Sequence, residues 1–377
     1  MQKKGKKDPS DMRHGYTTGA CSTAATKAAL IALITGEVQE EATIHLPVGR
    51  DVTFSMEKCE INETAVTAET IKDAGDDPDA TDKARIVSTV SWTDTPGVTL
   101  DGGTGVGRVT KPGLPVPVGE AAINPVPRRM ILTTVQEVME EFQIDRGVKV
   151  VISVPDGEEI AKKTLNGRLG IVGGISILGT RGIVVPFSSS AYMASIVQAI
   201  SVAKSGGCDH LVLTTGGRSE KYAMGLFPFL PEEAFIEMGD FVGFSLKNCK
   251  KQGIKKVSLV GMMGKFSKVA QGVMMVHSKS APVNFEFLAN IARSVGASEE
   301  LAAEVEGANT ASQVGELMAQ ANHDEFFRQL CEACCRSAYH HIKGGVEIET
   351  AIYSMKGQLL GRAVGIDSIG ETNRNRG

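Results

Sequence analysis

The first half of the chain begins with an apolar helical pattern and continues with alternating ones. Small apolar residues recur at helical spacing between Thr18 and Gly36, with Thr17 or Thr18 as candidate N-cap and Gly36 as the stop. Stretches of alternating polarity follow, separated by acidic and Pro/Gly turns, at 42–46, 52–61, 64–72, 84–92 and 97–100. One helix followed by several strands predicts an α+β first domain with a mostly antiparallel sheet, over residues 15–145.

The second half has a different pattern, in which short apolar runs alternate with glycine turns and helical stretches. The apolar runs and the helical stretches between them are 149–154, 190–204, 210–215, 240–251 and 256–261. This order is typical of βαβ units on a parallel sheet. We therefore predict a Rossmann-like α/β domain over residues 146–345, whose last part, 285–343, is a helical extension.

The two ends of the chain differ from both domains. Residues 1–14 are polar and basic, with little to bury, and are predicted to be a loose tail. Residues 346–366 contain two apolar stretches around Lys356-Gly357 and are predicted to form a hairpin. Because chain ends often lie close together, one arrangement returns this hairpin to the sheet of the first domain.

Composition and charge narrow the class of protein. The 40 Lys and Arg against 44 Asp and Glu give a net charge of −4, which argues against a nucleic-acid binder with a broad basic field. The longest apolar run, 28–34, is shorter than the ~20 residues of a membrane helix, and no apolar signal region follows the basic N-terminus. Seven cysteines without a disulfide-like framework indicate a reducing compartment. We expect a soluble, cytoplasmic protein without nucleic-acid or membrane partners. The sequence leaves its oligomeric state open, a homo-oligomer being one option.

Glycine is the outlier in composition, at 42 of 377 residues, and two glycine turns that follow apolar runs are the strongest candidates for a site. One is 214–219 (TTGGRS) and the other is 261–268 (GMMGKFSK), which lacks the spacing of a Walker A loop. Ligands of open α/β sheets bind beyond the carboxyl ends of strands, so we expect both turns to open on one edge. The alternative is that the glycines only permit the turns and that the lysines lie on a solvated helix.

Two segments of the first domain also invite a functional interpretation. The run 101–107 (DGGTGVG) is rich in glycine, but β-branched residues and Pro112 follow it instead of the helix that a dinucleotide fingerprint requires. A flexible lid or a substrate contact remains an alternative there. In 123–129 (INPVPRR) two prolines fix the backbone beside Arg128 and Arg129, which either aims the two guanidinium groups or makes a rigid connector.

Candidate metal ligands and acid–base groups are few. Cys331, Cys334 and Cys335 share one face of a predicted helix, as core residues would, and no second Cys-x-x-Cys completes a set of four ligands. His277 is either a general base or a structural histidine. Glu237 and Asp240 precede a helix, where carboxylates complement its dipole.

Six motifs in order resemble one known family, the cobalt-precorrin-5B C-1 methyltransferases of the anaerobic cobalamin pathway, over about residues 14 to 366. The motifs are 15–21 (GYTTGAC), 101–107 (DGGTGVG), 123–128 (INPVPR), 214–220 (TTGGRSE), 235–243 (FIEMGDFVG) and 260–265 (VGMMGK). Gly217 departs from the expected pattern, so the resemblance assigns no role to this residue. The resemblance implies methyl transfer from S-adenosylmethionine to carbon 1 of the cobalt-containing corrin precursor, giving cobalt-precorrin-6A.

The resemblance also implies what the site residues must do. No nucleophilic side chain is required, because the donor methyl group is already activated. A substrate fringed with acetates and propionates needs cations, for which the candidates are Arg128, Arg218, Lys265 and Lys268. The donor needs backbone N–H groups and close approach, for which the candidates are Thr214, Thr215, Gly216, Gly261 and Gly264. Additional candidates are Thr17, Thr18, Asp101, Gly103, Asn124, Glu237, Asp240 and His277. Cobalt would arrive with the substrate, so no metal site of the protein is expected.

Two other functions stay open on the sequence. A nucleotide-dependent oxidoreductase would use the same sheet edge, but it needs an acidic residue at the end of a following strand to hold a ribose, which the pattern does not locate. A non-catalytic tetrapyrrole-binding protein would bind the macrocycle without saturable affinity for S-adenosylmethionine.

Overall fold

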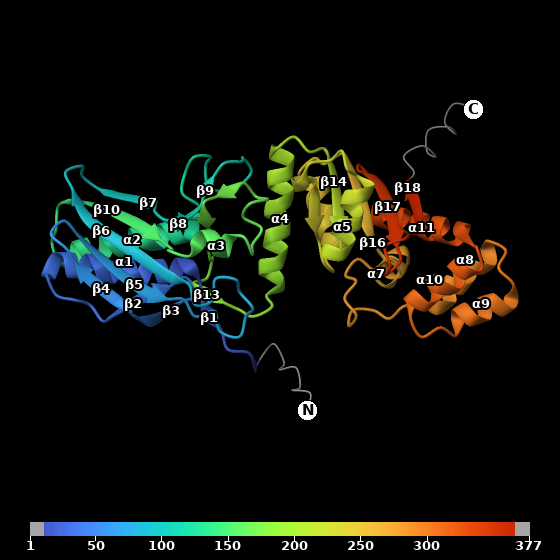
Figure 1. Ribbon diagram of the computed structural model, residues 1–377, viewed down its shortest axis with the longest axis horizontal. Helices are drawn as coiled ribbons and strands as arrows, with labels where there is room; N and C mark the ends of the chain where they lie inside the picture. The colour runs from blue at the N-terminus through green and yellow to red at the C-terminus, as the bar shows by residue number, and fades with distance from the viewer. Residues whose placement is uncertain (1–10, 366–377) are drawn as a thin grey trace. The chain divides into compact units, whose positions relative to one another are not determined.

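The computed structural model describes residues 11–365, so most of the predicted basic tail lies outside the described residues. The chain divides into two compact units, unit 1 over Met1–Ser189 and unit 2 over Ser190–Gly377. Unit 1 runs from blue to green in Figure 1, and unit 2 runs on to red. Each unit has its own hydrophobic core. The fold is mixed, with several sheets, as expected for a chain that combines α+β and α/β parts.

Unit 1 is built on a five-stranded sheet in the order β4-β5-β6-β10-β7. These strands are β4 Lys58–Ile61, β5 Ala65–Ile71, β6 Arg85–Thr93, β10 Gly147–Ser153 and β7 Val98–Gly102. A separate hairpin pairs β2 Glu41–Leu46 with β3 Arg50–Ser55. Two-residue strands pair β1 Gly15–Tyr16 with β13 Ile183–Val184, β8 Gly105–Val106 with β12 Gly174–Ile175, and β9 Arg108–Val109 with β11 Ile171–Val172. The helices of unit 1 are α1 Thr18–Thr35, α2 Pro125–Glu141 and the short α3 Gly157–Ala161.

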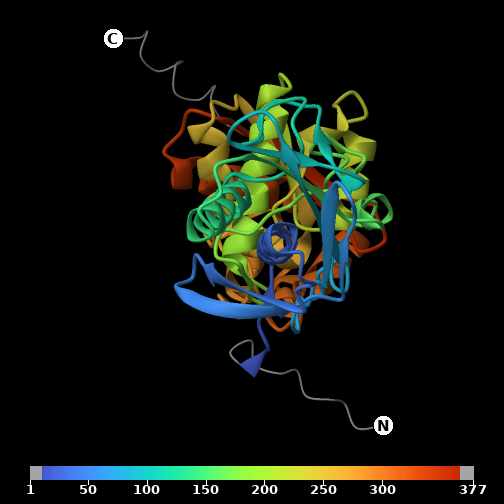
Figure 2. The same cartoon turned by 90° about the vertical axis from the view of Figure 1, so that its left-hand side faces the viewer.

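Helix α1 forms the centre of the unit 1 core. Its small side chains let it pack closely on β5, β6 and α2, and Figure 2 looks almost along its axis. The predicted boundaries are confirmed, because Thr17 caps the helix and Gly36 ends it with φ of 74°. By length and composition α1 could cross a membrane, but 72% of it is buried inside the protein. Its apolar surface is therefore taken up by contacts within the unit.

The predicted boundary between the domains is wrong. The apolar run 149–154 was expected to begin the second domain, but it forms β10, which lies between β6 and β7 in the sheet of unit 1. It pairs antiparallel with β6 and parallel with β7. Val150, Val151 and Ile152 are consecutive apolar residues, which is also the pattern of a strand in a parallel sheet, so the sequence alone cannot assign this run to one sheet or the other. The division falls after Ser189 and not after residue 145.

Unit 2 contains a second five-stranded sheet, in the order β15-β14-β16-β17-β18. Its strands are β14 His210–Thr214, β15 Phe235–Glu237, β16 Lys256–Met262, β17 Glu347–Tyr353 and β18 Leu359–Val364. The first four strands in this order are parallel, and β18 is antiparallel to β17. The helices that accompany the sheet are α4 Ser189–Ser205, α5 Gly217–Leu226, α6 Val242–Lys251 and α7 Met263–Ala270, with a 3₁₀ turn η2 at Glu232–Ala234.

The predicted helical extension is confirmed and the predicted return of the hairpin is not. The extension comprises α8 Phe285–Ser294, α9 Glu299–Glu306, α10 Ala311–Gln320 and α11 Asp324–Ile342. Strand β17 pairs parallel with β16 along its whole length and β18 then folds back onto it, so both strands extend the sheet of unit 2. The reason is burial, because nearly every residue of β17 is buried and requires a neighbour on both sides.

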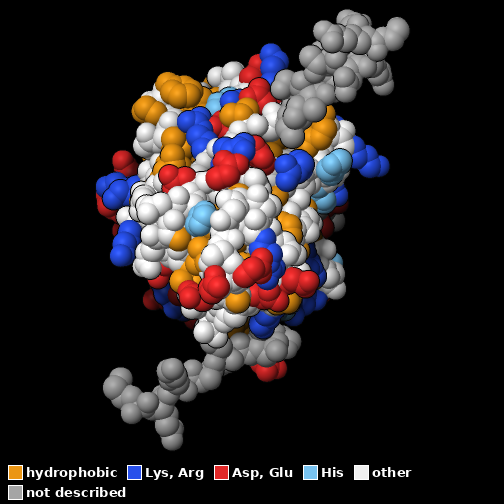
Figure 3. Space-filling model, turned by 90° about the vertical axis from the view of Figure 1, so that its right-hand side faces the viewer, with side chains coloured by type: hydrophobic (Ala, Val, Ile, Leu, Met, Phe, Trp, Pro, Cys, Tyr) orange, Lys and Arg blue, Asp and Glu red, His pale blue; other side chains and the backbone are white. Residues whose placement is uncertain are grey.

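The surface agrees with the small net charge. On the face drawn in Figure 3, acidic and basic side chains are interspersed and no wide area carries one sign. Association through a long-range field of one sign is therefore not favoured on that face.

Candidate functional site

The carboxyl ends of three neighbouring strands in unit 2 bring together the principal candidates. Thr214, at the end of β14, lies opposite Glu237 of β15 on one side and Val260 of β16 on the other. Because these strands are parallel, the loops that follow them open on the same edge of the sheet, as predicted for two of them. Ligands of open α/β sheets bind at this edge.

Lys265 connects all three loops. Its ammonium group donates to the Thr215 carbonyl, after β14, at 3.1 Å, and lies 3.1 Å from the Asp240 carboxylate, after β15. Lys265 itself follows β16 in the first turn of α7, and 37% of its side chain is exposed. These contacts fix the loops relative to one another, so Lys265 has a positioning role besides any contact with a ligand.

The glycines of these loops meet different surroundings. A Cβ atom added at Gly261 would lie 2.1 Å from the Phe266 ring, so this glycine is required by packing. Added at Gly264 or Gly217, it would meet nothing within 4 Å. Gly216 has φ of 155°, which side chains rarely allow. The backbone at Gly216, Gly217 and Gly264 is thus open to close approach, whereas that at Gly261 is not.

Glu237 supplies the acidic group that the sequence pattern could not locate. It ends β15, the strand that follows β14 and α5 in a βαβ unit, and it is exposed. Its Oε1 atom lies 3.9 Å from the position of a Cβ at Gly216, so the carboxylate stands beside the glycine turn. A carboxylate in this place accepts hydrogen bonds from ribose hydroxyls in many nucleotide-binding sheets.

An aromatic residue that the sequence reasoning missed supports the same loops. The Tyr192 hydroxyl of α4 donates to the Glu237 carbonyl at 3.3 Å, and its ring is tilted against Phe241 with centroids 5.6 Å apart. The close approach of Gly239, which has φ of 58°, leaves no room for a side chain next to this ring. Burial and the nearby carboxylates raise the pKa of Tyr192, so the hydroxyl stays a neutral donor.

The remaining cations of unit 2 differ in availability. Arg218 is exposed in the first turn of α5 and makes no hydrogen bond or ion pair with residues 11–365. Lys268 is 6% exposed and donates to the carbonyls of Val276 and His277, at 3.4 and 3.3 Å. His277 is exposed, and its Nδ1 accepts from the Lys279 N–H at 3.2 Å. Lys268 and His277 thus stabilise a loop, while Arg218 is free to meet an anion.

Arg128 and Asn124 lie in unit 1, at the start of α2. Asn124 is the N-cap residue by backbone geometry, without a hydrogen bond from its side chain to the helix. Arg128 follows two prolines in the first turns and lies 3.2 Å from the Glu120 carboxylate. It lines an open groove of unit 1, so the predicted cations are divided between the two units.

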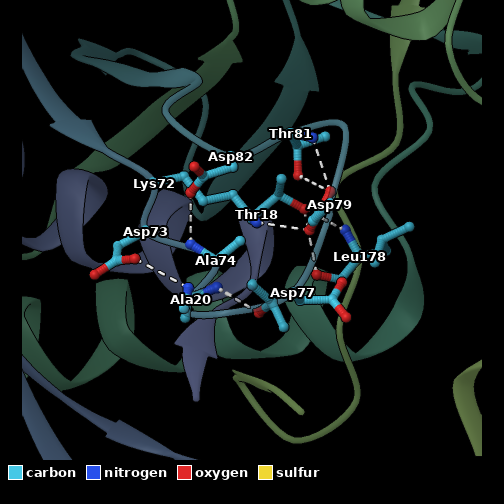
Figure 4. A network of polar contacts seen from close by, with 12 residues as sticks. Thr18, Ala20, Lys72, Asp73, Ala74, Asp77, Asp79, Thr81, Asp82 and Leu178 are labelled. Carbon is cyan, nitrogen blue, oxygen red and sulfur yellow. Dashed lines mark hydrogen bonds and ion pairs between the residues drawn. The ribbon is translucent and has the colours of Figure 1, made fainter. Parts of the chain in front are cut away.

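Thr17 and Thr18 belong to a buried junction. The Thr17 hydroxyl accepts from the Ala20 N–H at 3.2 Å, and the Thr18 hydroxyl accepts from the Leu178 N–H at 2.9 Å. Figure 4 shows Thr18 and Leu178 near an ion pair between the buried Lys72 and the partly buried Asp79, 2.7 Å apart. The hydroxyls and the first N–H groups of α1 are thus used within the protein, which indicates a structural role for this motif.

The glycine run 101–107 is also used for packing. A Cβ at Gly103 would lie 2.4 Å from Ser153 Oγ, and one at Gly105, with φ of 70°, would overlap the Val154 carbonyl. The short strand β9 follows the run directly, and the helix that a dinucleotide fingerprint requires does not, as expected from the sequence. Burial opposes ionisation of Asp101, but hydrogen bonds from Arg108 and the Gly102 N–H outweigh it and lower the pKa of Asp101. Asp101 and Gly103 therefore hold this segment together.

The cysteines of α11 form part of the core of unit 2. Cys331, Cys334 and Cys335 are 0 to 2% exposed, and burial raises the pKa of each thiol. The predicted core role is confirmed. Within residues 11–365, no group of three or more His, Cys, Asp and Glu side chains is arranged to hold a metal ion.

Known proteins match both units. The family model described as CbiD matches residues 5–186, and the model described as CbiD, C-terminal domain, matches residues 275–364. A solved structure, the 1.9 Å crystal structure of the cobalamin biosynthesis protein CbiD from Archaeoglobus fulgidus, is 31% identical and covers 67% of this chain and 78% of its own, with a TM-score of 0.38.

Curated relatives extend the similarity to almost the whole chain. The cobalt-precorrin-5B C(1)-methyltransferase of Geobacillus sp. (strain WCH70) is 70% identical, over 95% of this chain and 98% of its own. Proteins of the same name from Priestia megaterium and Rubrobacter xylanophilus are 68% and 52% identical, over 95% and 89% of this chain and 98% and 87% of their own. The family resemblance of the six motifs is confirmed, and the chain belongs to the CbiD family.

Proposed function

We propose that this protein methylates carbon 1 of cobalt-precorrin-5B in cobalamin biosynthesis, with S-adenosylmethionine as donor and cobalt-precorrin-6A as product. The observation that carries this proposal is the name shared by relatives up to 70% identical over nearly the full length of both chains. At such identity a change of reaction would require a change in the site. Three of the motifs, 214–220, 235–243 and 260–265, supply the loops of the candidate site in unit 2.

The carboxyl edge of the unit 2 sheet is the proposed donor site, in what we infer to be a Rossmann-like domain. The open backbone at Gly216 and Gly264 fits a ligand that approaches closely, and Thr214 and Thr215 begin the same turn. The exposed Glu237 carboxylate beside Gly216 fits the hydroxyls of a ribose. S-adenosylmethionine supplies an activated methyl group when bound, so the protein has mainly to hold the donor and the acceptor carbon in line.

The other residues of this edge are proposed to orient the ligands. Asp240 and the Thr215 carbonyl hold the Lys265 ammonium group, which keeps one cation at a fixed place beside the glycine turns. Arg218, exposed on α5, is the cation best placed in unit 2 to meet a carboxylate of the substrate. Gly261 and Lys268 are not needed for binding in this proposal, since packing and loop contacts account for them.

One requirement of the alternative function, a nucleotide-dependent oxidoreductase, is met. The acidic residue that it requires at the end of a following strand exists, as Glu237 on β15. A ribose occurs in both kinds of ligand, so this carboxylate does not separate the two functions. The shared name of the relatives favours the methyltransferase. A cytoplasmic location and a homo-oligomer stay predictions.

Calorimetric titration of the full-length protein separates the three functions. S-adenosylhomocysteine is expected to bind saturably at one site per chain, and a reduced nicotinamide cofactor is expected to give no heat of binding. The opposite pattern would favour the oxidoreductase. Binding of the corrin without binding of S-adenosylhomocysteine or S-adenosylmethionine would favour the carrier.

A further inference from the structure

We propose that the groove of unit 1 between α2 and residues 115–120 binds the carboxylate-bearing macrocycle, an inference that rests on the function proposed above. The groove has a volume of about 610 Å³, within the range of ~300–1,000 Å³ that is usual for small-molecule sites. All of its lining residues lie in unit 1.

One face of α2 forms a side of the groove. The lining residues from this helix recur every three or four positions along one stripe: Pro125, Arg128, Arg129, Leu132, Thr133 and Gln136. The opposite stripe of α2, which includes Ile131 and Val135, is buried in the core of unit 1. The helix is therefore anchored on one side, and the groove residues project from a rigid support.

The walls of the groove suit the face of a flat ring. Pro115, Val116 and Pro117 line the groove from the segment that precedes α2, and Pro125 and Leu132 add apolar surface from the helix. Proline fixes its own backbone, so three prolines leave these walls little freedom to lose when a ligand binds. An apolar groove with rigid walls would bury part of a macrocycle without rearrangement.

Two arginines in adjacent positions supply the charge. Arg129 is exposed and makes no hydrogen bond or ion pair within the described part of the chain. Among residues 11–365, Arg128 forms one ion pair, 3.2 Å from the Glu120 carboxylate, and 31% and 52% of the two side chains are exposed. An ion pair between side chains this exposed contributes little stabilisation. We infer that Glu120 takes the place of a substrate carboxylate, which can displace it and meet the guanidinium group in two-point contact.

The chemistry of the groove favours a polycarboxylate ring over other small molecules. The ring would lie against the proline walls, and acetate or propionate side chains at its edge would reach Arg128 and Arg129. A neutral apolar ligand would leave both guanidinium groups unpaired, and a small free anion would not use the apolar walls. The groove therefore best accommodates a ligand that has both an apolar ring face and carboxylates at its edge.

The proposal is tested by titrating the full-length protein with the cobalt corrin cobyrinic acid, whose peripheral carboxylates are free, and following its absorbance. The variants Arg128→Gln and Arg129→Gln are each expected to raise Kd about tenfold, the usual effect of losing one charge-assisted hydrogen bond. Glu120→Gln is expected to lower Kd about threefold, because it removes the competing carboxylate. The fully methyl-esterified corrin is expected to bind weakly to every form.

Arg50→Gln is the matched control, since it makes the same charge change at an exposed position on β3 of the same unit. Thermal melting of each variant shows that it is folded. The proposal is overturned if Arg128→Gln and Arg129→Gln bind the corrin as Arg50→Gln does, if the ester binds as tightly as the acid, or if the wild-type protein does not bind the corrin.

A separate methylation assay distinguishes this inference from the proposed function. Corrin binding that depends on the groove arginines, without methylation of cobalt-precorrin-5B, would refute the methyltransferase and support the groove. Methylation with groove variants that bind and react like the wild type would refute the groove and leave the function intact.

Discussion

At the scale of single residues, Gly261 and Gly264 show how one glycine turn combines packing with openness. Gly261 faces the Phe266 ring, whereas nothing lies within 4 Å of a side chain placed at Gly264. The sequence identifies both as turn glycines, but it cannot tell which of them a ring fills, because that depends on how α7 packs on β16.

The two positions predict opposite results for the same substitution. Gly261→Ala is expected to lower the free energy of unfolding by about 1–3 kcal/mol, because the new methyl group overlaps Phe266. Gly264→Ala should leave stability unchanged or slightly raised, since alanine is the better helix former. It should instead lower kcat/KM for the donor. Urea denaturation and donor-dependent kinetics measure the two effects, and loss of stability in Gly264→Ala with unchanged kinetics would refute this assignment.

The carboxylate of Glu237 gives a second prediction at this scale. Glu237→Gln is expected to raise KM for S-adenosylmethionine about tenfold, because a carboxylate that accepts from ribose hydroxyls is lost. The exposed position of Glu237 means that the melting temperature should not change. Glu304→Gln on α9 makes the same change at another exposed site and serves as control. Equal KM values in the two variants would remove Glu237 from the donor site.

The sequence predicted the edge on which two turns open, but it did not predict where a long side chain points. The turns at 214–217 and 261–265 lie on one sheet edge as expected. Lys268 lies in α7, the helix that follows the glycine turn. Its ammonium group, however, donates to backbone carbonyls of the loop after α7. The direction of a long side chain depends on tertiary contacts that spacing does not contain.

At the scale of elements, a buried polar ladder connects three strands of the unit 2 sheet. His210 of β14 lies 2.8 Å from the Ser258 hydroxyl of β16, which donates to Glu349 of β17 at 2.9 Å. Glu349 is fully buried and forms ion pairs with Arg362 and Lys256. Burial opposes the ionisation of Glu349, but these partners outweigh it and lower its pKa.

The ladder predicts a loss of stability in acid. Folded Glu349 has a lower pKa than the unfolded side chain, so its contribution is present above about pH 4.5 and is lost as pH falls. Burial first, and then Lys256, lower the pKa of His210. The unfolded histidine therefore takes up a proton first, and stability begins to fall below about pH 6.5. Urea denaturation at a series of pH values from ~3 to ~8 measures both steps.

Substitution of the buried carboxylate tests the same ladder. Glu349→Gln is expected to lower the free energy of unfolding by about 2 kcal/mol at neutral pH and to flatten the decline below about pH 4.5. Glu347→Gln on the same strand is the control. Its carboxylate is 42% exposed beside Lys256, so its loss should cost less than ~1 kcal/mol. Equal losses in both variants would contradict the importance of the buried partner.

Element prediction from the sequence failed at two strands for different reasons. Strand β10 was recognised but assigned to the wrong sheet, because its three consecutive apolar residues, 150–152, do not show which strands lie beside it. Strand β15 was missed because three residues, Phe235–Glu237, are too few to show a period. The sequence signal for β15 was the apolar pair Phe235-Ile236. A strand predicted there would have placed Glu237 at its carboxyl end.

At the scale of the whole molecule, the division after Ser189 predicts which fragments fold. Fragments 1–189 and 190–377 each retain a complete five-stranded sheet and core, so each is expected to show a cooperative thermal transition by circular dichroism. A cut after Asp145 removes β10 from between β6 and β7, and the first fragment should then lose cooperativity. Cooperative unfolding of 1–145, together with failure of 1–189, would refute the division.

Transfer of an isotope label shows whether this chain methylates carbon 1 of a cobalt corrin precursor. Purified protein is incubated with cobalt-precorrin-5B and S-adenosylmethionine labelled with carbon-13 in its methyl group, and the product is examined by NMR. We predict one labelled methyl resonance per macrocycle, with a two-bond correlation from the methyl protons to C-1. Absence of transfer, or a label at another ring carbon, would show that the chain is not a C-1 methyltransferase.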